Sequence, residues 1–389
     1  SYKSNQEKSV RMTFDELLTV YNKELNVLDD NLIATVTATI LCCRLYTDQL
    51  WLIIVGPSGS GRTETVMGYS ECSEVIMVSS LSQNALMSGY KEHKKDTKDY
   101  SLLPTLNKKC LVVKDATTIV SLPLAYKNKI ISELRDIYDG TSSKATGMGQ
   151  RFYKARFSAL FLATNDIQHL AERALMSLFG ERFLFYNIRG VGIGRRRSEV
   201  SRILNLDSQR LNVVRRRIKY AVNHFMEDYD LGSLEKTKVP EKLVDLIMLT
   251  AQLRTPVVRD TFQNYQVKQP PIVEMPKRLA SQVRTLYRIT DSFNSTIVNP
   301  LTLTSKVLWS TIPDLRRILM EYLLKNQYIE TKEAIKLLKV GGMFGRCTLA
   351  DLHLLEILDK ESIRHNVARW ELKPAVKESL REFLGYILY

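Results

Sequence analysis

Four short apolar runs, rich in β-branched residues, constrain the fold of this chain more than any other feature. Each run is followed by a polar or glycine-containing turn and then by a segment of helical periodicity. Strands that are buried on both faces have continuous apolar sequences, and strands that alternate with helices form parallel sheets. The sequence therefore predicts an α/β fold, a three-layer sandwich around a parallel sheet. The runs are WLIIV (51–55), VIMVSS (75–80), CLVVKD (110–115) and ALFLATN (159–165).

Helical periodicity dominates the regions on either side of these runs. Apolar residues recur at helical spacing within residues 1–50, and again from about 198 to 293. A linker rich in Pro and Gln at 261–276 interrupts the second region, and a helix is expected to start near Pro276. We therefore expect an N-terminal helical segment, an α/β core, a helical lid region and a C-terminal domain. Their predicted bounds are 1–30, 31–197, 198–300 and 301–389.

The C-terminal domain is predicted to be winged-helix-like. Helices are expected at 312–325, 331–339 and 348–358, followed by the alternating strand VARWEL at 367–372. The third helix would be the recognition element of such a domain. Its sequence, with Asp351 and Glu356, is not basic. A domain that packs on the rest of the protein or on a partner is therefore as consistent with the sequence as one that reads DNA.

The charge balance points to a polyanionic partner. Lys and Arg number 56 against 42 Asp and Glu, which gives a net charge of +14. Such an excess is typical of proteins that bind nucleic acid or an anionic membrane surface. No run of eighteen apolar residues exists to span a bilayer, and the first residues lack the apolar core of a signal peptide. The five Cys show no C-x-x-C spacing, so we expect buried reduced thiols in a cytoplasmic protein.

A glycine-rich loop follows the first apolar run. It reads Gly56, Pro57, Ser58, Gly59, Ser60, Gly61, Arg62, Thr63 and leads into a helical segment. Glycines allow backbone N–H groups to point at phosphate oxygens, and the helix N-terminus adds to the attraction. The loop therefore predicts a nucleotide site in which the Thr63 hydroxyl binds Mg²⁺. Arg62 stands where the motif has Lys, and a guanidinium fork is not equivalent to an ammonium.

Two further strand ends carry polar residues. Asp115 follows the third apolar run, where P-loop ATPases hold the metal through water, and Asn165 ends the fourth run, where an amide can orient the attacking water. The neighbour of Asp115 is Ala116 instead of a glutamate that would polarise that water. Asp115 can alternatively cap the helix that follows, and Asn165 can be a turn former.

In these motifs the chain resembles an AAA+ ATPase, and within that class the minichromosome-maintenance-like (MCM-like) helicases of phages and mobile elements. The resemblance covers roughly residues 30–375. The stretches that carry it are GPSGSGRTE (56–64), SSLSQNALMSG (79–89), CLVVKDATTI (110–119), ISELRDIYDG (131–140), FLATNDI (161–167), FGERFLFY (179–186) and PKRLASQVRTL (276–286).

The resemblance implies further roles. Arg182 corresponds to an arginine finger that reaches into the ATP site of a neighbouring subunit, and Arg278 to the lid arginine called sensor two. The loop through Glu64 would hold ATP, while Thr63 and Asp115 would hold Mg²⁺. A guanidinium supplied across an interface stabilises charge on the transferred phosphoryl group, so the site would be complete only in a closed homo-oligomeric ring, most simply a hexamer. Arg182 also has a plain interpretation, as an exposed Arg before an apolar strand.

Three basic stretches are candidates for DNA binding. Residues 91–98 contain Lys91, Lys94 and Lys95, and residues 144–154 resemble the family's presensor hairpin, with Gly147 and Gly149 near its tip. Cations and an aromatic residue on such a hairpin suit the phosphates and bases of a single strand. The basic stretch 189–219 could line DNA or pair with the next subunit. The hairpin residues expected at DNA are Lys144, Arg151, Tyr153 and Lys154.

Two functions of different classes follow from the sequence. The first is an ATP-driven ring that translocates on single-stranded or forked DNA, as a replicative helicase of a phage or mobile element in a bacterial cytoplasm. The second is a non-helicase AAA+ switch, such as a helicase loader or origin-binding factor that acts with replication proteins. The basic hairpin favours the motor, while Arg62 and Ala116 favour the switch because both weaken the hydrolysis machinery. A scaffold with an inactive nucleotide site is a third alternative.

Overall fold

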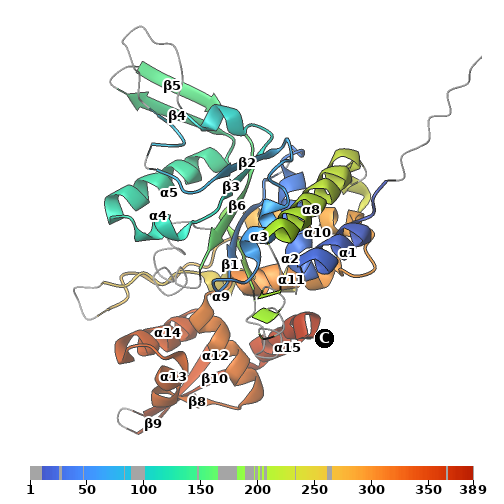
Figure 1. Ribbon diagram of the computed structural model, residues 1–389. Coiled ribbons are helices and arrows are strands. Elements are labelled where there is room, and N and C mark those ends of the chain that lie inside the picture. The colour runs from blue at the N-terminus through green and yellow to red at the C-terminus, as the bar shows by residue number, and fades with distance from the viewer. Residues whose placement is uncertain are drawn as a thin grey trace, which may run out of the picture.

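A five-stranded parallel sheet forms the centre of the computed structural model (Figure 1). The strands are β1 (Trp51–Val55), β2 (Val75–Val78), β3 (Cys110–Val113), β6 (Ser158–Ala163) and β7 (Leu184–Asn187), in the order β2-β3-β6-β1-β7. The four predicted strands and their parallel arrangement are confirmed. The structure describes residues 11–25, 29–46, 48–82, 84–88, 101–146, 149–164, 182–188, 197, 200–201, 204–205, 208–232, 234–260, 265–364 and 367–388.

Successive residues of β1 enter two separate cores. Leu52 and Ile54 pack in one apolar cluster, while Ile53 and Val55 pack in another on the opposite face of the sheet. Both faces are therefore covered by helices, as expected for a parallel sheet. The first face carries α1 (Phe14–Leu25), α2 (Asp30–Cys42), α3 (Arg62–Met67), α8 (Ser208–Asp228) and α10 (Lys277–Ser292); the second carries α4 (Thr117–Ser121), α5 (Leu124–Tyr138) and the short 3-10 helix Leu103–Leu106.

The outer edge of β7 is covered by α11 (Pro300–Thr311). The N–H of Phe185 donates to Thr311 Oγ1 at 3.1 Å, and the N–H of Asn187 donates to Ser310 Oγ at 3.1 Å. Side-chain hydroxyls thus take the place of a sixth strand, which protects the edge from pairing with another chain. The helix α9 (Lys242–Arg254) contacts both α10 and α11. A 3-10 turn at Leu234–Lys236 precedes it.

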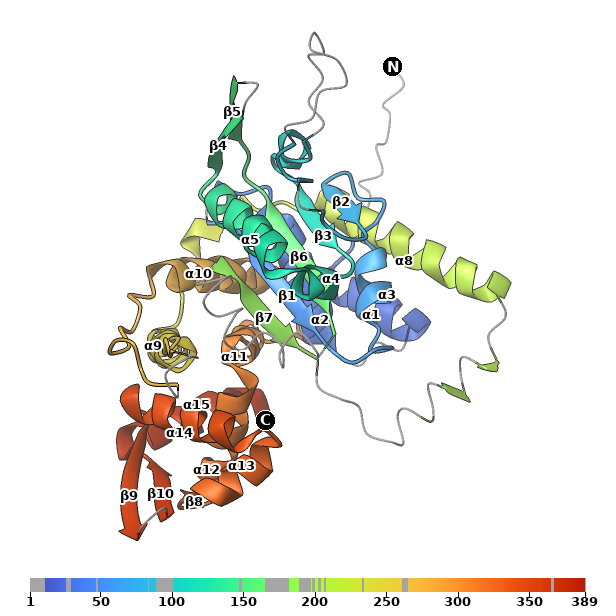
Figure 2. The same cartoon turned by 90° about the vertical axis from the view of Figure 1, so that its left-hand side faces the viewer.

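An antiparallel hairpin of β4 (Thr141–Thr146) and β5 (Gly149–Lys154) stands off from the sheet beside α5, at the top of Figures 1 and 2. It confirms the hairpin expected at 144–154. The register places Thr146 opposite Gly149 at the tip and Thr141 opposite Lys154 at the base.

The C-terminal unit consists of helices around a three-stranded antiparallel sheet of order β8-β10-β9. The predicted third helix at 348–358 is wrong in its bounds, because the helix starts at Gly342, ends at Leu354 and is followed by a strand. Gly345 of this helix is a packing residue, since a Cβ there would lie 2.7 Å from Ile335 Cγ1. The elements are α12 (Asp314–Lys325), β8 (Ile329–Glu330), α13 (Thr331–Leu338), α14 (Gly342–Leu354), β9 (Leu358–Arg364), β10 (Val367–Leu372) and α15 (Pro374–Leu388).

The apolar cluster on the α2 face continues into this unit through α9 and α11, and includes Ile329, Leu349 and Leu384. The described cysteines, all five in the chain, are buried and free, as predicted. Among the described residues, no helix combines the length and the apolar character needed to cross a membrane.

Candidate nucleotide site

The glycine-rich loop leaves β1 at the carboxyl edge of the sheet. Gly59 and Gly61 have φ angles of +75° and +79°, a conformation that side-chain-bearing residues rarely adopt. A Cβ on Gly56 would lie 2.9 Å from Ser60 Oγ and 3.1 Å from Ile188 Cβ. The loop is therefore specified by glycine at three positions, and it ends at the N-terminus of α3.

Two polar atoms of this loop are buried without a hydrogen-bond partner among the described residues, Ser60 Oγ and Arg62 Nη1. Burial lowers the pKa of Arg62, and the negative charge of Asp115 partly opposes this shift. A buried guanidinium N–H without an acceptor is costly, and a phosphate oxygen would satisfy it. The residues of this loop therefore fit a bound polyphosphate, with Arg62 in the place of the usual Lys.

Asp115 follows β3 at the same edge, and β6 separates β3 from β1, the strand that leads into the loop. Its Oδ1 accepts a hydrogen bond from the N–H of Thr117 at 3.0 Å, which is the local capping contact allowed for by the sequence. Ala116 is buried, and its N–H donates to Leu162 O at 2.8 Å. The position beside Asp115 therefore holds a methyl group within the core and supplies no carboxylate.

Sequence inspection missed a threonine pair at this edge. The N–H of Thr164 donates to Thr117 Oγ1 at 3.2 Å, and the two hydroxyls lie 3.4 Å apart. The contact ties the end of β6 to the start of α4. Thr164 directly follows β6, and Thr117 is the first residue of α4, four residues after the end of β3. Their positions soon after apolar runs are the only sequence feature that marks them. Asn165, the next residue, lies outside the described part of the chain.

Glu64, expected to belong to the nucleotide loop, forms an ion pair with α8. Arg215 holds it through two contacts, Nε to Oε2 at 3.0 Å and Nη2 to Oε1 at 2.5 Å. Arg217 pairs with Glu24 at 3.0 Å, and Lys219 pairs with Glu71 at 2.9 Å. These three cations of the basic stretch 189–219 therefore have partners within their own chain, an outcome that neither sequence alternative included.

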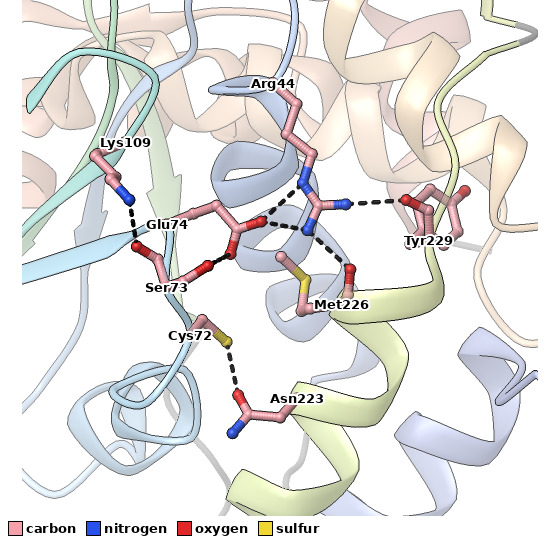
Figure 3. Close-up of polar contacts among 8 residues, drawn as sticks. All are labelled: Arg44, Cys72, Ser73, Glu74, Lys109, Asn223, Met226 and Tyr229. Carbon is pink, nitrogen blue, oxygen red and sulfur yellow. Dashed lines mark hydrogen bonds and ion pairs between the residues drawn. The ribbon is translucent and has the colours of Figure 1, made fainter.

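A second polar network fixes the C-terminal end of α8 (Figure 3). The Arg44 guanidinium contacts Glu74 Oε1 at 2.5 and 3.0 Å and donates to the carbonyls of Met226 and Tyr229 at 2.8 and 2.9 Å. The last carbonyls of a helix lack partners within the helix, and Arg44 supplies one. Cys72 Sγ donates to Asn223 Oδ1 at 3.2 Å nearby. The α3–β2 turn and α8 are thus joined as one unit.

Arg182 and Arg278 converge on one carboxylate. Arg182 Nη2 lies 3.8 Å from Asp139 Oδ2, and Arg278 Nη2 lies 3.3 Å from Asp139 Oδ1. The Arg182 side chain is only 15% exposed, so the plain interpretation as an exposed residue is wrong. Asp139 follows the last turn of α5. It lies within the stretch 131–140 that carries the resemblance, but the sequence assigned it no role.

This cluster lies at the opposite edge of the sheet from the glycine-rich loop. Leu184 pairs with Leu52, so Arg182 is level with a point two residues before Leu52, whereas Gly56 lies four residues after it. Six residues of strand span about 20 Å. Neither arginine can therefore reach the loop of its own chain.

Helix α10 positions both arginines. Gln282 Nε2 donates to the carbonyl of Arg182 at 2.7 Å, and the Gln282 side chain is completely buried. The Arg278 guanidinium lies over the ring of Tyr138, 5.4 Å from its centroid. A cation above an aromatic face is stabilised by the ring quadrupole. The two arginines are thus held in place by side chains from α5 and α10.

The hairpin differs from the sequence expectation at its aromatic residue. Tyr153 is buried, and its hydroxyl lies 3.0 Å from Ser101 Oγ, so the expected contact of Tyr153 with DNA is wrong. The neighbouring Phe152 is 72% exposed, because successive residues of a strand face opposite sides. Lys154 is also exposed. The exposed aromatic of the hairpin is therefore Phe152.

Two predicted basic residues of the hairpin, Lys144 and Arg151, occupy directly opposite positions in the register. Lys91, Lys94 and Lys95 lie outside the described residues.

Helix α14, the expected recognition helix, packs against its own chain. Its Asp351 is 8% exposed and accepts from Arg259 Nε at 2.7 Å. Gln252 of α9 donates to the carbonyl of Leu355 at 2.7 Å, directly after α14. One acidic residue of this helix, Asp351, therefore binds Arg259 of the same chain.

The chain matches no known protein-family model, and no curated protein sequence is similar to it at a significant level.

Proposed function

We propose that the chain is an AAA+ ATPase of the MCM-like type, a ring-forming DNA motor that acts as a replicative helicase. The observation that carries the proposal is the separation of two sets of charged groups. The phosphate-compatible loop lies at the carboxyl edge of the sheet, and the Arg182–Arg278 pair lies about 20 Å away at the amino edge. Joined head to tail, two copies would bring one set to the other.

In this proposal each site takes residues from two copies. The loop from Gly56 to Thr63 binds the phosphates of ATP, Arg62 donates to a phosphate oxygen, and Thr63 and Asp115 face Mg²⁺. The neighbouring copy supplies Arg182 and Arg278, whose guanidinium groups stabilise the negative charge that develops on the transferred phosphoryl group. Bound ATP would supply the phosphoryl group, and its transfer to water, which releases ADP and phosphate, would drive movement.

The hairpin supports DNA as the substrate of the motor. Exposed Phe152 offers a stacking face for bases, and Lys154 offers a charge for the backbone. Among the described residues, no carboxylate lies within ion-pair distance of Lys154, in contrast to the paired cations of α8. The helix–strand–helix–helix–strand–strand order of 314–372 supports a winged-helix assignment for the C-terminal unit.

One observation favours the alternative of an AAA+ switch. The buried Ala116 leaves the position beside Asp115 without a carboxylate to polarise water. In a switch, ATP binding would control assembly, and slow hydrolysis would be sufficient.

Strand displacement on a forked DNA separates the two functions. With ATP and Mg²⁺ the motor displaces the strand, and with a non-hydrolysable analogue it does not. Assembly on DNA without displacement under either condition would favour the switch.

Nucleotide binding is tested at Thr63. Because its hydroxyl would ligate Mg²⁺, Thr63→Ala should weaken Mg²⁺-dependent nucleotide affinity by roughly tenfold, the order of one lost charge-assisted contact. Affinity in excess EDTA should stay unchanged. Titration calorimetry of both proteins, with and without Mg²⁺, measures this. Equal affinities in all four titrations would contradict the assignment.

A further inference from the structure

The exposed face of the hairpin continues beyond the end of β5. Phe152, Lys154 and Arg156 are exposed, and the residues between them are buried, so the three lie on one face of the extended chain. The N–H of Ala155 donates to the carbonyl of Gly140 at 3.1 Å, which keeps the two chain segments side by side past the last paired strand residues. Four residues of strand span about 13 Å. An aromatic and basic face therefore reaches from the hairpin to the amino edge of the sheet, where β6 begins.

Three segments from different parts of the chain meet at Arg156. Its Nη1 donates to the carbonyl of Tyr46 at 3.1 Å, and its carbonyl accepts from the N–H of Lys108 at 2.7 Å. Asn107 Oδ1 accepts from the N–H of Arg156 at 3.1 Å. The Lys108 ammonium lies over the Tyr46 ring, 5.0 Å from its centroid. We call Tyr46, Lys108 and Arg156 the Tyr46 cluster; they precede β1, β3 and β6 respectively.

Backbone geometry fixes the cations of this cluster. Gly140 has a φ angle of +85°, and a Cβ there would lie 3.1 Å from Arg156 Cγ, so the Arg156 stem lies against a position that requires glycine. Lys108 has a φ angle of +58°, which residues with side chains rarely adopt. Such backbone strain is concentrated at functional sites. The cations are held in place by the fold, and less conformational entropy is lost when they bind a ligand.

The cluster is exposed, and its charge is not neutralised by its own chain. Tyr46 is 74% exposed, and Lys108 and Arg156 are also exposed. Within the described part of the chain, no carboxylate lies within ion-pair distance of either cation. Asp48, which follows Tyr46 by two residues, is exposed and pairs with neither. The cluster differs in this respect from α8, whose cations Arg215 and Lys219 are paired.

An exposed aromatic ring beside unneutralised cations suits a single strand of nucleic acid. Unpaired bases stack on aromatic rings, and cations bind the phosphates between the bases. The groups that contact Tyr46 are a guanidinium and an ammonium, so its surroundings favour a polyanion over an apolar protein surface. The cluster also continues a face that already carries Phe152 and Lys154.

We propose that the Tyr46 cluster is a second subsite for single-stranded nucleic acid, in which a base stacks on Tyr46 and phosphates contact Lys108 and Arg156. One strand runs from Phe152 past Lys154 to this subsite. The inference rests on DNA as the substrate of the proposed motor, and it extends the path of the strand from the hairpin to the amino edge of the sheet.

Single-strand affinity tests the ring of Tyr46. Fluorescence anisotropy with a labelled oligonucleotide compares the wild type with Tyr46→Ala, which should bind roughly tenfold more weakly, the order of one base stacked on an aromatic ring. The matched control is Tyr220→Ala on α8, because Tyr220 is 73% exposed. The control should bind as the wild type does.

Lys108→Gly tests the charge without weakening the fold. Glycine adopts a φ angle of +58° without steric cost, so the midpoint of urea unfolding should not fall. The slope of log affinity against log salt should decrease by about 0.7, because one phosphate contact is lost.

Photo-cross-linking locates the bases directly. A single strand that carries iodouracil should cross-link to Tyr46 as well as to Phe152. Cross-links to Phe152 without any to Tyr46 would overturn the proposed subsite.

Unchanged affinity in Tyr46→Ala, or an unchanged salt slope in Lys108→Gly, would overturn the inference. If Phe152→Ala still weakened binding, the proposed function would remain intact. A wild type that binds no single strand would contradict both. Variants that bind DNA normally but fail to self-assemble in sedimentation velocity would show that the cluster contacts a second copy instead.

Discussion

The two edges of the central sheet are built in opposite ways. At the carboxyl edge, a loop with two left-handed glycines leaves Ser60 Oγ and Arg62 Nη1 buried without a partner among the described residues. At the amino edge, Arg182 and Arg278 share the carboxylate of Asp139. At the first edge two polar atoms of the loop lack a partner within the described part of the chain, and the second edge concentrates cations that its own chain cannot bring to the first. Under the proposed function, this difference divides one nucleotide site between the two ends of the domain, and contact between copies completes it.

The largest expected effect comes from removing the cation at the amino edge. Arg182→Ala should lower the ATPase rate by roughly 10³-fold, as for other arginine fingers, because the transferred phosphoryl group loses a charge partner. Nucleotide affinity should stay within about twofold, since the loop is untouched. Steady-state ATPase and nucleotide titration measure the two effects. Arg182→Lys should not restore the rate, because an ammonium lacks the planar fork. A wild-type ATPase rate in Arg182→Ala would show that the arginine at the amino edge takes no part in hydrolysis.

The hairpin offers a sharper comparison between two adjacent aromatic residues. Phe152→Ala should weaken single-strand binding by about 2 kcal/mol, the value of one base stacked on an aromatic ring. Tyr153→Phe should leave DNA affinity unchanged and lower the free energy of unfolding by about 1 kcal/mol, because it loses the contact with Ser101. Fluorescence anisotropy with labelled oligonucleotides and urea unfolding measure the pair. A larger loss of DNA affinity in Tyr153→Phe than in Phe152→Ala would show that Tyr153, and not Phe152, contacts the bases.

The ion pair of Arg44 and Glu74 should make the stability of the fold depend on pH. Burial alone would raise the pKa of Glu74, but Arg44 and the hydrogen bonds to the carboxylate outweigh it, so the pKa lies below its ordinary value of 4.5. The pair therefore stabilises the fold fully above pH 4.5, and this contribution is lost as the pH falls through the lower folded pKa.

Glu74→Gln should accordingly destabilise the protein by about 2 kcal/mol at pH 7. The difference from the wild type should shrink as the pH falls below 4.5. Urea unfolding at several pH values measures it. A difference that is constant with pH would show that the charge on Glu74 is not the cause.

The smallest effects are expected on the paired cations of α8. Arg217→Ala should change the free energy of unfolding by less than about 1 kcal/mol, since the pair with Glu24 is largely exposed on its Arg side. It should also leave the salt dependence of DNA binding unchanged. Lys154→Ala on the hairpin should instead reduce the slope of log affinity against log salt by about 0.7. A reduced slope in Arg217→Ala would instead show that this residue of α8 contacts DNA phosphates.

Local patterns predicted much of the fold. Apolar runs gave the strands, and the order of glycines gave the loop, because both depend on residues that are neighbours in sequence. The predicted third helix began at 348, whereas α14 begins at Gly342 and has Gly345 in its first turn. Only the folded domain shows that Gly345 packs closely against Ile335.

Contacts between residues far apart in the sequence limited how much of the candidate site could be predicted. The carboxylates that pair with Arg215, Arg217 and Lys219 come from positions 148 to 193 residues away, so the basic stretch could not be recognised as internally paired. Alternation along β5 shows that Phe152 and Tyr153 face opposite sides, but only the distant Ser101 shows which side is buried. Asp139 becomes visible as a partner of both arginines only when α5, β7 and α10 are assembled.

Mixing two inactive variants tests the divided site most directly. Arg182→Ala keeps an intact loop, and Thr63→Ala combined with Gly61→Asp keeps an intact arginine pair. Each alone should have little ATPase activity, but a 1:1 mixture that co-assembles should recover about a quarter of the wild-type rate, because about that fraction of random head-to-tail contacts joins an intact loop to an intact arginine. Co-assembled mixtures that show no gain in ATPase rate at any ratio would contradict a nucleotide site shared between copies.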